Sequence, residues 1–84
     1  MAQPVVLEDW LEAMDAYESA QRFTRRWKNK AGGHMYVHLL EFERNMGTVL
    51  AWIQDQLRHE AKMSPTEWWE SVGCPAWQKY REGR

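Results

Sequence analysis

The stretch KNKAGGH, residues 28–34, decides the fold because it separates two long amphipathic segments. The adjacent glycines Gly32 and Gly33 permit the left-handed backbone that caps a helix and the tight reversal that follows it. No Gly or Pro interrupts residues 5–30. We therefore predict one helix over about 5–29 and a second over about 34–62, folded into an antiparallel hairpin.

Apolar residues recur at spacings of three and four in both segments, which is the period of an amphipathic helix. The first stripe consists of Val6, Trp10, Ala13, Tyr17, Ala20, Thr24 and Trp27. The second consists of Met35, Leu39, Phe42, Met46, Val49, Leu50, Ile53 and Leu57. Residues 35–42 are apolar on nearly all sides, so a short strand is the alternative there. We favour helix because only Val37 is β-branched in that stretch.

Two further signals concern glycine and proline. Gly47 inside the second segment indicates either a break or a close helix crossing. Ser64-Pro65-Thr66-Glu67 is a capping box with Pro at the first helical position. It predicts a short helix over about 65–72, which Gly73 ends. A second short helix follows over about 75–82. The expected fold is thus all-α: one domain over 1–84, a helical hairpin with a short Trp-rich C-terminal segment packed on it, three to four helices in total.

Two helices of this length have longer apolar stripes than the rest of the chain can bury. At 1.5 Å per residue they are about 36 and 43 Å long, and the C-terminal segment spans only part of that seam. A chain of 84 residues also builds a modest core. We therefore expect another protein, or a second copy in a homodimer, along the remainder.

The composition excludes several classes of protein. One cysteine among 84 residues rules out an intrachain disulfide, so a reducing cytoplasm is the expected location. The N-terminal residues lack the pattern of a signal peptide, and no apolar run is long enough for a membrane span. Gly-rich phosphate loops and nucleophile motifs are absent, so we expect neither enzymatic activity nor a cofactor.

Charges are sorted along the first segment. Residues 1–20 carry only acidic charges, Glu8, Asp9, Glu12, Asp15 and Glu18. Residues 21–31 carry only basic charges, Arg22, Arg25, Arg26, Lys28 and Lys30. The helix dipole favours acidic residues at the N-terminal end and basic residues at the C-terminal end, as here. Glu18 can also pair with Arg22, four residues later. An alternative function is nucleic-acid binding by the five bases together with the aromatic residues of 22–30, although the net charge of −1 argues against it.

Three residues have the spacing of metal ligands on one helix face, His34, His38 and Glu41. A zinc site needs at least three protein ligands, and the glutamate that follows histidine in zinc proteases is missing, since residue 35 is Met. We therefore predict no metal site and regard these side chains as ordinary surface residues.

The tryptophans favour a binding function. Neighbours on a helix point about 100° apart, so Trp68 and Trp69 cannot both face one core, and one is a candidate exposed anchor. The sequence thus favours a small protein–protein interaction module, such as a regulator, inhibitor, adaptor or accessory subunit. It would bind its partner protein through the apolar stripe and exposed Trp. The expected partner-binding residues are Trp10, Tyr17, Trp68, Trp69 and Trp77. On this hypothesis Trp68→Ala or Trp69→Ala abolishes binding without loss of helix.

Overall fold

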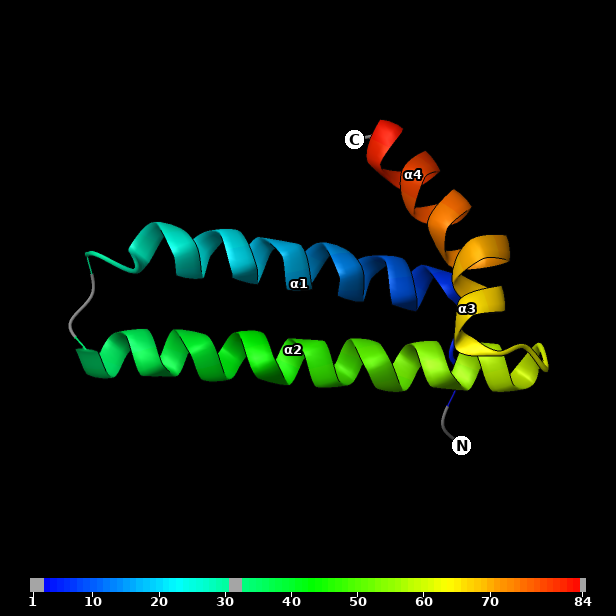
Figure 1. Cartoon of the computed structure of the whole chain (residues 1–84), viewed down its shortest axis with the longest axis horizontal. Coiled ribbons are helices and arrows are strands. Elements are labelled where there is room, and N and C mark those ends of the chain that lie inside the picture. The colour runs from blue at the N-terminus through cyan, green and yellow to red at the C-terminus, as the bar shows by residue number, and fades with distance from the viewer. Residues whose placement is uncertain (1–2, 31–32, 84) are drawn as a thin grey trace.

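A computed structural model describes residues 3–30 and 33–83, and every regular element among them is helical. In chain order these are α1 (Leu7–Trp27), α2 (Gly33–Glu60), α3 (Pro65–Trp68), the π-helical turn η1 (Trp69–Gly73) and α4 (Cys74–Glu82). Figure 1 shows α1 and α2 as an antiparallel hairpin, with the C-terminal helices packed at one end. The predicted fold class is confirmed, and residues 35–42 are helix rather than strand.

The ends of α1 follow the backbone chemistry expected of a helix. At its start the Val6 N–H donates to Asp9 Oδ2 at 2.9 Å, which satisfies one free amide. After Trp27 the chain leaves the helix in a turn, where the Lys30 N–H donates to the Trp27 carbonyl at 3.0 Å. The predicted glycine reversal includes Ala31 and Gly32, which lie outside the described residues. Gly33 itself is the first residue of α2 and does not adopt a left-handed conformation.

The end of α2 is capped by a lysine in the role that glycine usually fills. Lys62 has φ 59°, in the left-handed region. The Met63 N–H donates to the Arg58 carbonyl at 2.9 Å, and the Lys62 N–H donates to the His59 carbonyl at 3.1 Å. This pair of bonds is the Schellman motif, and it turns the chain toward α3.

The C-terminal segment is helical without interruption from Pro65 to Glu82. The capping box is confirmed, since the Glu67 N–H donates to Ser64 Oγ at 3.2 Å. The prediction that Gly73 ends a helix is wrong. The chain instead passes through η1, where the Cys74 N–H donates to the Trp69 carbonyl. This wider turn suits Pro75, which has no N–H and whose ring would clash with a carbonyl in a regular α-helix.

The core lies at the end of the hairpin that carries the C-terminal segment. It consists of Trp10, Ala13, Ile53, Trp68 and Trp77. Farther along, the Tyr17 ring lies over Gly47, where an added Cβ would come within 3.2 Å of Tyr17 Cε2. Gly47 indicated either a break or a close crossing, and the structure shows the close crossing, with α2 continuing through it unbroken.

Candidate interaction surface

The centre of the core is an aromatic cluster around Trp10. Its ring makes edge-to-face contacts with Trp68, Trp69 and Trp77, at centroid distances of 5.0, 6.1 and 6.4 Å. The indole Nε1 of Trp10 donates to Gln54 Oε1 of α2 at 3.3 Å. Trp10 therefore joins α1, α2 and the C-terminal segment, and its own polar atom is satisfied.

Some of the predicted binding residues belong to this buried cluster, and others reach the surface. Trp10, Trp68 and Trp77 are buried, so their rings are not available to a partner in this fold, and Trp68→Ala is now expected to damage the core. Tyr17 is half-buried over Gly47. Trp69 is 37% exposed, which agrees with the expectation that one of the two adjacent tryptophans reaches the surface. Partner binding by these residues stays a prediction.

Phe42 and Trp52 are the largest exposed apolar side chains of α2, and each lines a hollow between α1 and α2. Phe42 is 54% exposed and Trp52 is 56% exposed, and Val49 lies between them in sequence. We call this side of the hairpin the open face and define it by Phe23, Phe42, Val49 and Trp52 with the two hollows described next.

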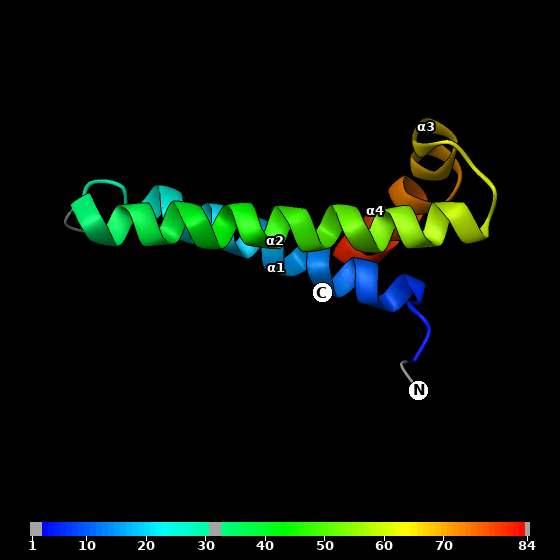
Figure 2. The ribbon, with the colours of Figure 1, turned by 90° about the horizontal axis from the view of Figure 1, so that it is seen from below.

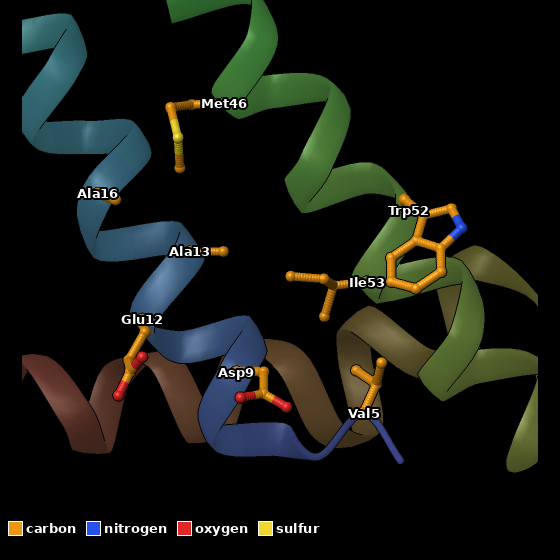
Figure 3. A pocket seen from close by; sticks show the side chains of 8 residues that line it. All are labelled: Val5, Asp9, Glu12, Ala13, Ala16, Met46, Trp52 and Ile53. Atoms are coloured by element: carbon orange, nitrogen blue, oxygen red, sulfur yellow. The ribbon is translucent and has the colours of Figure 1, made fainter. Parts of the chain in front are cut away.

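Two shallow hollows run along the open face. The first, of about 410 Å³, is lined by Val5, Asp9, Glu12, Ala13, Ala16, Met46, Trp52 and Ile53. Figure 3 shows α1 contributing alanines to it and α2 contributing Met46, Ile53 and Trp52. The second, of about 360 Å³, is lined by Ala16, Ser19, Ala20, Phe23, Thr24, Leu39 and Phe42. Because Ala16 lines both, the hollows lie end to end as one groove between α1 and α2.

The C-terminal segment covers a different side of the hairpin. Tyr80 OH donates to Asp15 Oδ2 at 3.3 Å, and Leu11 packs against the core together with Tyr80. On α1, Leu11 and Ala16 point about 140° apart, since each residue advances the helix by about 100°. In Figure 2 α3 and the N-terminal segment lie on opposite sides of α2. The C-terminal segment therefore leaves the open face uncovered, and Val5 of the N-terminal segment lines one end of it.

The stretch 22–30 is exposed except for Thr24, and several of its side chains contact one another. Phe23 and Trp27 stack on each other at 5.6 Å, and the Arg26 guanidinium lies 5.8 Å from the Phe23 centroid. The predicted pairing of Glu18 with Arg22 is present at 3.9 Å. All five basic residues that would contact nucleic acid are solvent-exposed: Arg22, Arg25, Arg26, Lys28 and Lys30.

The three candidate metal ligands, His34, His38 and Glu41, lie on the exposed surface of α2. His38 Nδ1 lies 3.9 Å from Glu41 Oε2, and both side chains are exposed, as is His34. Across residues 3–30 and 33–83 no three metal-ligating side chains come together.

Sequence reasoning missed Trp52. The three-four spacing does not select it, because Ile53 beside it completes that spacing and is buried. The signal available in the sequence was a tryptophan directly flanking the apolar stripe, a position that borders the core without entering it.

Comparison with known proteins adds no family or homologue. No family model, curated protein or solved structure matches this chain significantly. Of the described helices, none is long and apolar enough to cross a membrane.

Proposed function

We propose that this chain is a small protein-interaction module and that the open face is its docking surface. The observation that carries the proposal is the groove between α1 and α2, bordered by aromatic side chains that are about half exposed. Contiguous apolar surface of this kind marks interaction sites, and aromatic residues supply much of the binding energy in interfaces.

The groove suits a helix of the partner protein. A helix laid between α1 and α2 would bury its apolar side chains against Ala16 and Ala20, the small residues that line the groove. Phe42 and Trp52 of α2 would close over it, while Asp9 and Glu12 would contact its polar edge. A module of this kind can act as a regulator, inhibitor, adaptor or accessory subunit. The single cysteine suits the reducing cytoplasm, where we place the protein.

The test compares exposed apolar residues on and off the open face. Phe42→Lys should abolish capture of the partner by the tagged chain, because a charge enters an apolar contact. Val37→Lys is the matched control, since Val37 is 51% exposed on α2 and points about 140° away from Phe42. Captured proteins are identified by mass spectrometry, and helix content by circular dichroism. Equal capture by both variants would contradict the proposal.

A second candidate function is nucleic-acid binding by the basic stretch, supported by the exposure of all five basic side chains. It predicts that affinity for a labelled oligonucleotide falls steeply with salt. Arg25→Glu combined with Arg26→Glu would then remove binding. Salt-independent affinity would contradict this function.

A further inference from the structure

The contacts between α1 and α2 show which residues lie level along the hairpin. Tyr17 lies over Gly47, and Thr24 Oγ1 donates to the Leu39 carbonyl at 3.5 Å. Ser19 lies between these two contacts on α1. It is therefore level with residues 44–45 of α2.

Two opposite charges at the edge of the open face are placed symmetrically about Ser19. Glu12 lies seven residues before it and Arg26 seven residues after it. Residues seven apart share one stripe of a helix. Glu12 and Ser19 line the groove, and Arg26 lies over Phe23, which also lines it. One edge of the open face is thus acidic at one end and basic at the other, with Ser19 at its centre.

Two of the three exposed apolar side chains that α2 contributes to the open face are placed symmetrically about the same level. Phe42 and Val49 are seven residues apart, and both are exposed on the open face. Their midpoint lies between residues 45 and 46. This is within about one residue, or roughly 1.5 Å along the axis, of the position level with Ser19. The charged pair on α1 and this apolar pair on α2 are therefore centred on one point of the hairpin.

We propose that the occupant of the open face is a second copy of this chain, related by a two-fold axis that crosses the hairpin at this point. The inference rests on the proposed function. The two hairpins pack face to face with their turns at opposite ends, so α1 lies antiparallel to α1 of the other copy. Glu12 then pairs with Arg26 of the other copy, and Phe42 packs against Val49 of the other copy. Each contact occurs twice, as two-fold symmetry requires.

Charge and area both favour this arrangement. The antiparallel pairing places the acidic half of each α1 beside the basic half of its copy, so the edge attracts itself only in this orientation. A face of two helices about 30 Å long and about 20 Å wide supplies about 600 Å² per copy. The total of about 1,200 Å² reaches the lower limit of specific stable interfaces. The result is a four-helix bundle, which buries the stripes that the C-terminal segment leaves exposed.

The experiment measures the mass of the full chain by sedimentation equilibrium over a range of concentrations. The wild-type chain should form a species of twice 10.1 kDa. Phe42→Lys should be monomeric, and Val37→Lys should dimerise normally. Glu12→Arg alone and Arg26→Glu alone should each weaken dimerisation by about tenfold or more, because each places like charges together twice. The double variant should restore it. The two residues are about 21 Å apart within one α1, so restoration cannot arise inside one chain.

The outcomes separate this inference from the proposed function. A wild-type chain that stays monomeric overturns the dimer, and the proposed function still stands if the monomer captures another protein through Phe42. A monomer without such capture overturns both. A dimer that survives Phe42→Lys overturns the open face as its interface. A dimer in which the double variant is no better than the single variants overturns the antiparallel arrangement.

Discussion

The two ends of the hairpin are built from the same two helices but differ in what covers them. At the Trp end, defined by Trp10, Ile53, Trp68 and Trp77, the C-terminal segment adds a third layer and all four residues are buried. At the turn end, defined by Phe23, Trp27 and Met35, no third helix of the described residues covers α1 and α2, and these three side chains are exposed.

The difference shows that a periodic apolar stripe alone does not determine burial. Trp10 and Trp27 both belong to the stripe of α1, yet Trp10 is fully buried and Trp27 is 38% exposed. Two helices in contact shield only the line where they meet, so large side chains beside that line need another element. In a chain of 84 residues the stability is therefore concentrated at the Trp end.

The largest expected effect tests that concentration directly. Trp10→Ala should lower the free energy of unfolding by about 3–5 kcal/mol, because it leaves a cavity and an unpaired Gln54 side chain. Trp27→Ala, at the turn end, should cost less than about 1 kcal/mol. Both values come from urea titrations followed by circular dichroism. Equal losses for the two variants would show that the ends are equally stable and would break the comparison.

A smaller effect is expected from a pair of glycines, one at each end. Gly73→Ala would place a Cβ 2.6 Å from Cζ3 of Trp68, so we expect a loss of about 1–3 kcal/mol from overpacking. At the turn end, Gly33→Ala meets nothing within 4 Å and should be neutral or stabilising by up to about 1 kcal/mol. Thermal unfolding of the two variants gives the measurement. A Gly73→Ala variant as stable as the wild type would mean that the packing around Trp68 is loose.

The smallest effect is expected from the backbone strain at Lys62, which lies at the Trp end of the hairpin. Lys62 holds a left-handed conformation that costs a residue with a side chain about 1–2 kcal/mol. Lys62→Gly should therefore stabilise the chain by about 1 kcal/mol or less, after the greater flexibility of glycine in the unfolded state is subtracted. Lys62→Ala is the control, since it removes the charge and retains the strain. A gain in Lys62→Ala equal to that in Lys62→Gly would assign the effect to charge.

The sequence was sufficient for those parts of the fold that depend on local chemistry. Helical periodicity predicts the hairpin, and Ser64 and Glu67 predict the start of α3. Gly47 predicts either a break or a close crossing, and the structure shows the crossing. These features depend on residues near in sequence or on a missing side chain.

The candidate surface could not be predicted in the same way. Periodicity places Trp10 and Trp27 on one stripe but does not say where along the hairpin the C-terminal segment docks. The burial of Trp68 and Trp77 depends on that docking. The chain stays helical through Gly73 because of the Trp68 ring and Pro75. The spacing of apolar residues does not reveal either effect.

The arrangement of the tryptophans also equips the molecule with an optical reporter. Trp10 holds three of the other five indoles in fixed edge-to-face geometry, and this geometry exists only while the C-terminal segment is docked. Coupled indoles in a fixed, asymmetric arrangement give near-ultraviolet circular dichroism, which is lost when packing loosens even if the helices remain. Trp52, exposed on α2, should emit at longer wavelength and respond to whatever approaches it. One unlabelled sample therefore carries separate signals for closure of the core and for contact at the surface.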